Sequence, residues 1–231
     1  MKYDYLKENY DYLISDLKEI CGKNGKNFNE ITLVAVSKTF SSEEILEVNK
    51  LSHIDFGENK VQELKTKHDE LINEKINWHL IGHLQTNKIK YIIDFVSLIH
   101  SVDSLKLALE INKHAEKINK KINILVQVNT SYENQKSGIE IEETKTLCDE
   151  ISKLNYLTLN GLMTIGMFTD DETIIRENFR QLKRLFDELK LEHNDFKYLS
   201  MGMTSDYKIA LEEGSNMLRI GSAIFGNRNY L

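Results

Sequence analysis

The stretch Ile31–Phe40, ITLVAVSKTF, begins with an uncharged and largely β-branched run, and a lysine, Lys38, follows that run. A short continuous apolar run is typical of a strand that is buried on both faces of a parallel sheet. Amphipathic segments with periodic Leu and Ile separate this run from seven more of the same kind. These begin at His53, Asn77, Phe95, Ile122, Thr158, Lys197 and Asn216. The alternation predicts buried strands covered by helices.

The order of these segments predicts one domain over residues 1–231. A first amphipathic helix is expected from about Tyr3 to Ile20, and Ser41 or Ser42 with Glu44 forms a plausible capping box. Aspartates stand at or near the starts of the helices that follow Val102 and Asp170. Eight strand–helix units without a Gly/Ser linker favour an α/β fold, a single (β/α)8 TIM-type barrel with an additional N-terminal helix. A doubly wound open sheet is the alternative, because a count of units does not prove closure.

Composition excludes several classes of protein. Hydrophobic residues make up 41% and charged residues 29% of 231 residues, as in ordinary folded domains. The formal net charge of −6 argues against a nucleic-acid surface. No apolar stretch reaches the roughly 20 residues that a membrane span needs, and the N-terminus lacks the pattern of a signal peptide. We therefore expect no nucleic-acid partner, no membrane and a cytoplasmic location. Two distant cysteines support neither disulfides nor a metal site.

Polar and small residues collect where the predicted strands end. In parallel barrels these carboxyl ends form the mouth at which chemistry takes place. The residues in question are Lys38, Gly57, Glu58, Asn59, Gly82, His83, Ser101, Asp103, Asn129, Thr164, Ser200 to Thr204, Gly221 and Ser222. The sequence thus predicts a site at one mouth of the barrel.

Two cations are unusual in this pattern. Lys38 directly follows an apolar strand, where burial would lower the pKa of its amine and make it a nucleophile for a Schiff base. An ion-paired structural lysine is the other interpretation. Arg219 interrupts a strand, and its buried guanidinium needs an acceptor, either an internal carboxylate or a ligand. A zinc site at His79 and His83 is not expected, because no carboxylate or cysteine accompanies them.

Two small-residue turns follow the last two strands. Turns at Ser200–Asp206 and Gly221–Gly226 occupy the positions of the recurrent phosphate site of such barrels, where glycine lets backbone amides approach and hydroxyls donate. An amine, an arginine and a phosphate cradle at one mouth fit a phosphorylated aldehyde with a ring acceptor, and pyridoxal phosphate is such a molecule. A Schiff-base aldolase acting on a sugar phosphate is a further interpretation.

Several segments together resemble the pyridoxal phosphate homeostasis protein family, which is related to the barrel domain of alanine racemase. The segments run in order from about Leu33 to Gly226, nearly the whole chain. They are AVSKTF, FGENKVQEL, WHLIGHLQTNK, HSVDS, SGI, GLMTI, LSMGMTSDYKIAL and MLRIGSAIFG. The resemblance implies a (β/α)8 barrel that binds pyridoxal 5'-phosphate.

The resemblance also implies roles for individual residues. The cofactor would be joined to Lys38 and its pyridine nitrogen would face Arg219. The phosphate would be held by Ser200, Gly202, Thr204, Gly221 and Ser222, where Thr204 replaces the serine usual in the family. Apart from the resemblance, Asn59 is a candidate for a hydrogen bond near the cofactor, and capping of the following helix explains it at least as well. Lys136 matches a second family lysine and would be a secondary contact.

The function expected from these residues is intracellular vitamin B6 homeostasis, in which the cofactor is held as a Schiff base and buffered or delivered. An arginine facing the ring nitrogen keeps that nitrogen unprotonated, so the ring is a poor electron sink. A small racemase or lyase is the alternative, but two-base racemisation needs a second base from a further domain, for which the sequence after Gly221 leaves no room. We expect no catalytic turnover, apo pyridoxal-phosphate-dependent enzymes as recipients, and a monomer.

Overall fold

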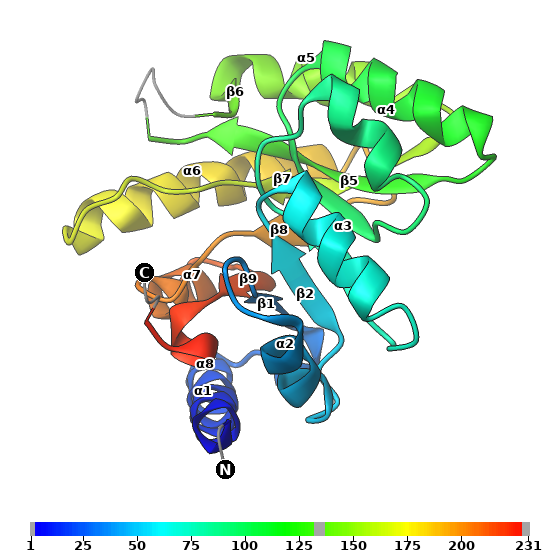
Figure 1. The fold of residues 1–231 in the computed structure, drawn as a ribbon. Helices are drawn as coiled ribbons and strands as arrows, with labels where there is room; N and C mark the ends of the chain where they lie inside the picture. Colours follow the sequence, from blue (N-terminus) through cyan, green and yellow to red (C-terminus); the bar gives the residue numbers. More distant parts are fainter. Residues whose placement is uncertain (1–2, 132–136, 228–231) are drawn as a thin grey trace.

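The computed structural model describes residues 3–131 and 137–227, and within them eight parallel strands close into a barrel (Figure 1). Each strand pairs with its neighbour in parallel, and the pairing of the fourth strand with the fifth closes the ring. The predicted barrel is therefore confirmed over the open sheet. Its strands are β1 (Thr32–Val36), β2 (Asp55–Glu58), β3 (Asn77–Leu80), β4 (Leu98–Val102), β5 (Ile122–Asn129), β7 (Leu157–Met163), β8 (Tyr198–Ser200) and β9 (Met217–Ile220). A two-residue strand, β6 (Ile139–Glu140), pairs with the end of β5.

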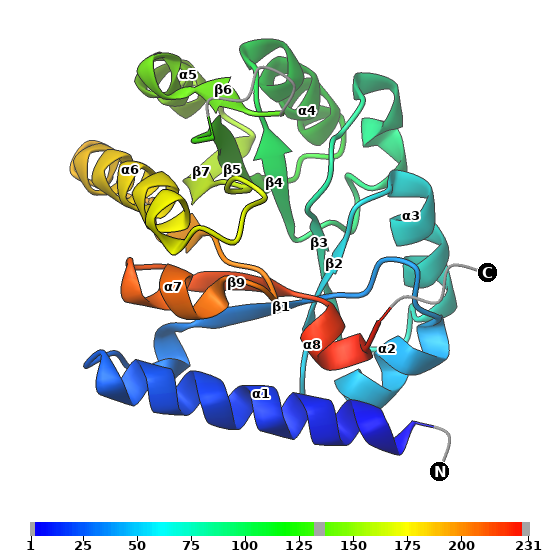
Figure 2. The ribbon, with the colours of Figure 1, turned by 90° about the vertical axis from the view of Figure 1, so that its left-hand side faces the viewer.

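Helices surround the barrel, as the periodic segments predict. They are α1 (Asp4–Lys23), α2 (Ser42–Asn49), α3 (Val61–Glu70), α4 (Leu105–Lys117), α5 (Ile141–Ser152), α6 (Glu172–Lys190), α7 (Tyr207–Glu212) and α8 (Ser222–Phe225), with 3₁₀ turns η1 (Phe28–Glu30) and η2 (Thr86–Tyr91). The additional N-terminal helix α1 lies across the outside and contacts α2, α7 and α8 (Figure 2). Within the described residues, no helix combines the length and apolar character that crossing a bilayer requires.

Helix starts follow the predicted capping chemistry with one difference. Ser41 and Glu44 form the capping box of α2, and Asp171 caps α6 by accepting a hydrogen bond from the Thr173 amide. At α4 the N-cap is Ser104, whose hydroxyl accepts from the Leu107 amide, and not the preceding Asp103. Both residue types are good caps, so sequence alone does not distinguish neighbours.

Strand register sets the level of each side chain inside the barrel. Arg219 on β9 pairs with Val34 on β1, and Val34 belongs to the small apolar cluster of the interior. Alternation along β1 then places Val36 one level higher and Lys38 just beyond the strand. The register therefore places the lysine directly above the level of the arginine at the same mouth.

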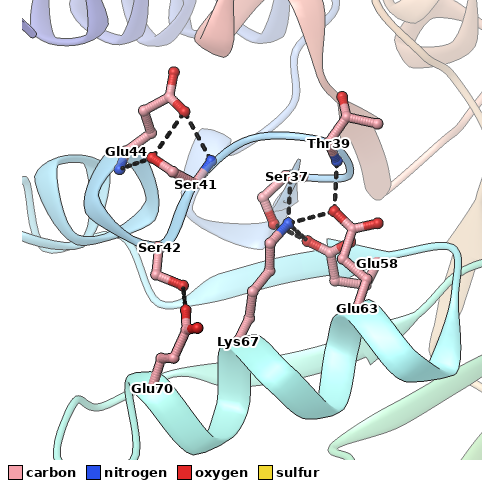
Figure 3. A network of polar contacts seen from close by, with 9 residues as sticks. All are labelled: Ser37, Thr39, Ser41, Ser42, Glu44, Glu58, Glu63, Lys67 and Glu70. Atoms are coloured by element: carbon pink, nitrogen blue, oxygen red, sulfur yellow. Dashed lines mark hydrogen bonds and ion pairs between the residues drawn. The ribbon is translucent and has the colours of Figure 1, made fainter.

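A buried ionic network fixes the chain on both sides of Lys38 (Figure 3). The ammonium of Lys67 on α3 donates to the Ser37 carbonyl at 2.8 Å, to Glu58 Oε1 at 2.8 Å and to Glu63 Oε1 at 2.7 Å. Glu63 also accepts a 2.6 Å hydrogen bond from the amide of Thr39. Thr39 has φ of 73°, a left-handed conformation that is costly for a β-branched residue. The network thus holds a strained turn directly after the lysine.

Glu58 belongs to this network and not to the barrel mouth, where its position at a strand end suggested a functional role. On β2, Phe56 packs in the outer core and Glu58 points the same way, toward α3. Ser37 Oγ donates to Glu58 Oε1 at 2.6 Å. Burial raises the pKa of Glu58 to about 6, although Lys67 and Ser37 act in the opposite direction. The cost of burying the carboxylate therefore exceeds the stabilisation it gains from Lys67.

We predict that Lys67→Met is far more destabilising than Glu58→Gln. The first change leaves a buried carboxylate without its cation, which costs about 3–5 kcal/mol, whereas glutamine keeps an acceptor for Lys67 and Ser37. Urea unfolding of both variants measures the difference. Equal losses of unfolding free energy would contradict the network's role.

The raised pKa of Glu58 also predicts a pH dependence. Because the folded state binds this proton more tightly than the unfolded state, the associated stabilisation is complete below the unfolded pKa of 4.5 and is lost as the pH rises through about 6. The unfolding free energy of the wild type should therefore fall between those values relative to Glu58→Gln. A constant difference across the window would show that the pKa is not raised.

Candidate functional site

A cavity of about 570 Å³ opens at the carboxyl ends of the strands. It brings together six of the eight predicted site residues, which come from the ends of β1, β2 and β9 and from the loop after β8. Its lining consists of Val36, Lys38, Asn59, Ile81, Gly82, Ile165, Phe168, Met203, Thr204, Ser205, Arg219, Gly221 and Ser222. The lining thus combines apolar side chains with hydrogen-bond donors.

Lys38 stands half-buried at the rim of this cavity. Its neighbours Val36 and Ile81 supply apolar surface from β1 and from the residue after β3. Phe168, in the loop after β7, also lines the cavity but is 97% exposed, so the mouth is open on that side. A primary amine in this position reaches both the apolar wall and the open mouth.

Arg219 forms part of the floor of the cavity and is 4% exposed. Its Nη1 donates to Ser200 Oγ and its Nη2 to the Thr164 carbonyl, both at 2.7 Å. Among the described residues, no carboxylate forms an ion pair with it, so the internal-carboxylate interpretation is not observed. Burial lowers the pKa of Arg219 to about 10, and the nearby Asp206 partly opposes this effect. The guanidinium is still protonated at neutral pH and has further N–H donors for a ligand.

The two predicted phosphate turns meet across the cavity. Thr204 Oγ1 accepts a 3.5 Å hydrogen bond from the amide of Ala223, which links the loop after β8 to the start of α8. Gly221 precedes α8, and a Cβ at this position would lie 3.3 Å from the Val36 carbonyl oxygen. Ser222 is exposed at the same rim. Hydroxyls and backbone amides of both turns therefore face one small region.

Two predicted residues, Ser200 and Gly202, lie beneath the lining. The Ser200 side chain is fully buried and accepts the hydrogen bond from Arg219. Gly202 has φ of +100°, and a Cβ there would lie 2.6 Å from the Cβ of Ala210. The structure therefore gives Ser200 a contact with the arginine and gives Gly202 a conformation and close packing that only glycine allows.

Asn59 and Lys136 were the less specific sequence predictions. Asn59 lines the cavity directly after β2. Its backbone packs closely on Gly82, because a Cβ added at Gly82 would lie 2.2 Å from the Asn59 carbonyl oxygen. Asn59 does not cap α3, whose N-cap residue is Lys60. Lys136 lies outside the described residues.

Sequence reasoning missed residues on both sides of Arg219. Ile165 and Phe168 line the cavity from the loop after β7, a position that the strand-end rule itself identifies. His100 on β4 is fully buried and contacts both Ser200 and His79. Alternation along the fourth run places His100 in the barrel, but an apolar strand containing one histidine gives no indication of its partners.

Comparison with known proteins agrees with this geometry. The family model for the N-terminal domain of alanine racemase matches residues 21–229. The pyridoxal phosphate homeostasis protein of Helicobacter pylori (strain ATCC 700392 / 26695) is 46% identical over 197 residues, covering 84% of this chain and 87% of that protein. The protein of the same name from Aquifex aeolicus is 39% identical over 224 residues, covering 96% and 98%.

A solved structure gives the same result. PipY of Synechococcus elongatus PCC7942, determined with PLP bound, superposes with a TM-score of 0.79 at 28% identity, covering 91% of this chain and 99% of that one. The closed barrel, the match to the family model and the near-complete coverage of the curated relatives lead to one assignment. The chain belongs to the pyridoxal phosphate homeostasis protein family.

Proposed function

We propose that this protein binds pyridoxal 5'-phosphate in the cavity above Arg219 and serves pyridoxal phosphate homeostasis by holding and releasing the cofactor in the cytoplasm. The observation that carries the proposal is the presence of Lys38 and Arg219 in the lining of one cavity of about 570 Å³. When bound, pyridoxal phosphate supplies an aldehyde that reacts with amines, and the PLP-bound structure of PipY is that of a relative with the same fold.

The donor set of the cavity fits this molecule. Lys38 would hold the cofactor through its amine, which is a nucleophile for the aldehyde and would attach it reversibly with loss of water. Arg219 offers N–H donors and no acceptor, so it suits an unprotonated ring nitrogen. Thr204, Gly221 and Ser222 supply the hydroxyls and amides that a phosphate requires. Ile81 would offer apolar surface to the planar ring.

The same residues favour binding over catalysis. A guanidinium with a pKa of about 10 does not transfer a proton to a pyridine nitrogen at neutral pH. Without that proton the ring withdraws electrons poorly, so the site stabilises little negative charge on a bound amino acid. The exposed Phe168 side of the mouth leaves room for a free amine to reach the aldehyde and displace Lys38. We propose apo pyridoxal-phosphate-dependent enzymes as recipients and a monomer as the functional form.

We predict that Lys38→Ala abolishes covalent attachment of the cofactor. The purified variant, mixed with pyridoxal phosphate, should lack the visible absorbance band of the wild type and resist borohydride labelling, because the amine nucleophile is gone. Lys90→Ala, which removes an exposed lysine on η2, is the matched control and should behave as the wild type. Unchanged labelling of Lys38→Ala would refute the assignment.

We also predict that Thr204→Val weakens binding of the phosphorylated cofactor selectively. Valine keeps the shape of threonine and removes the hydroxyl, and the loss of a hydrogen bond to a charged group costs about 1.5–3 kcal/mol, or roughly tenfold or more in affinity. Pyridoxal without the phosphate should bind both proteins equally. The two titrations are read from the visible absorbance, and equal losses for both ligands would place the phosphate elsewhere.

A further inference from the structure

A column of polar side chains crosses the barrel interior beneath the cavity. We define the polar column as Arg219, Ser200, His100, His79 and Asp55, which come from five different strands. Arg219 Nη1 lies 2.7 Å from Ser200 Oγ, and Ser200 Oγ lies 3.4 Å from His100 Nδ1. His100 Nε2 lies 2.9 Å from His79 Nδ1, and His79 Nε2 lies 3.1 Å from Asp55 Oδ1. An unbroken set of contacts thus links the two mouths.

The lower end of the column reaches solvent. The Asp55 side chain is 25% exposed and lines a separate cavity of about 390 Å³ at the amino ends of the strands. Burial alone would raise the pKa of this carboxyl, but hydrogen bonds from His79 and Asn77 outweigh it and the pKa lies below its ordinary value. Asp55 is therefore an ionised acceptor, and His79 Nε2 must carry a proton to donate to it.

The upper end fixes the protonation of the other histidine. Arg219 can only donate, so Ser200 Oγ is the acceptor of that contact. The fully buried Ser200 hydroxyl then has one proton of its own, and the nitrogen of His100 is the acceptor available to it among the described residues. A proton on His100 Nδ1 would leave the serine hydrogen without an acceptor. His100 Nδ1 is therefore unprotonated and its single proton lies on Nε2.

The donor and acceptor of the contact between the two histidines are then determined. His100 Nε2 donates to His79 Nδ1, so His79 is neutral with its proton on Nε2. Every donor in the column points the same way, from the guanidinium at the cavity to the carboxylate at the opposite mouth. Burial lowers the pKa of His100 well below its ordinary value, in agreement with a neutral imidazole.

From this geometry we infer that His100 is a positioning residue for Arg219 and acts through Ser200, within a one-directional hydrogen-bond chain that ends at Asp55. A serine hydroxyl that donates downward presents its lone pairs upward to Arg219. The guanidinium is then held by Ser200 on one side and by the Thr164 carbonyl on the other, with its remaining donors free for the cavity. Any effect of His100 on cofactor binding rests on the proposed function, whereas the hydrogen-bond chain from Arg219 to Asp55 does not depend on it.

Long-range proton–nitrogen spectra of the histidine side chains test the chain in the protein without cofactor. His79 and His100 should both appear as neutral Nε2–H tautomers at neutral pH, and the single variants His79→Gln and His100→Gln assign the signals. A proton on Nδ1 of His100, or a cationic His79, would reverse the direction of the chain and overturn the inference.

A matched pair of variants tests the positioning role. In His100→Asn the side-chain oxygen lies near the former Nδ1 and keeps an acceptor for Ser200. In His100→Gln the amide nitrogen lies near the former Nε2 and keeps only the contact with His79. The readout is the exchange with solvent of the Arg219 Nη1 protons, one of which is donated to Ser200, and this measurement requires no cofactor. His53→Leu is the control for loss of a buried histidine that is not a member of the column and contacts only the backbone carbonyl of Asp55 within it.

We expect the Arg219 Nη1 protons to exchange about tenfold faster in His100→Gln, and within about threefold of the wild-type rate in His100→Asn and His53→Leu, because a tenfold change corresponds to about one lost hydrogen bond. The dissociation constant for pyridoxal phosphate should follow the same order. Equal exchange in the two His100 variants would overturn the inference. If the wild type failed to bind pyridoxal phosphate, the proposed function would be wrong. The comparison of Arg219 proton exchange in the two His100 variants would still test the positioning role of His100.

Discussion

The Arg219 guanidinium is charged and almost fully enclosed by parallel strands, so its donors must find acceptors in the barrel or in the cavity above it. Two acceptors, Ser200 Oγ and the Thr164 carbonyl, fix its plane from below. The remaining donors make the cavity floor a surface that attracts a neutral or negative acceptor. An unprotonated pyridine nitrogen meets that requirement, and a cationic one does not. The limited chemistry expected of the site follows from this single buried charge.

A second constraint acts on Lys38 from outside the barrel. The Lys67 ammonium ties the Ser37 carbonyl to Glu58 and Glu63, and Glu63 holds the amide of Thr39 in its strained turn. The lysine backbone is therefore fixed on both sides, while its side chain extends into the cavity. An amine on a backbone that is fixed in this way can form and release a covalent bond without rearranging the fold. This is the property that a protein for storing a reactive aldehyde needs.

Much of this arrangement follows from the sequence. Continuous apolar runs give the strand positions, and the strand-end rule places Lys38, Asn59, Thr204 and Gly221 at one mouth. The rule fails for Glu58, because side chains alternate along a strand between the barrel interior and the surrounding helices. Two adjacent residues at a strand end therefore face opposite sides, and Glu58 faces the helices. Ser200 likewise points beneath the cavity toward Arg219 and His100. Such contacts depend on the register between strands that are distant in sequence. The hydrophobic pattern of a single sequence does not specify that register.

We propose that one cavity joins an amine, a donor for a ring nitrogen and a phosphate site in the geometry of a single ligand. The decisive measurement is a crystal structure of the protein grown with pyridoxal phosphate. We expect continuous density from Lys38 Nζ to the ligand, the ring nitrogen within hydrogen-bond distance of Arg219, and the phosphate between Thr204 and Ser222. A ligand bound with its ring nitrogen turned away from Arg219, or attached to another lysine, would show that the proposal is wrong.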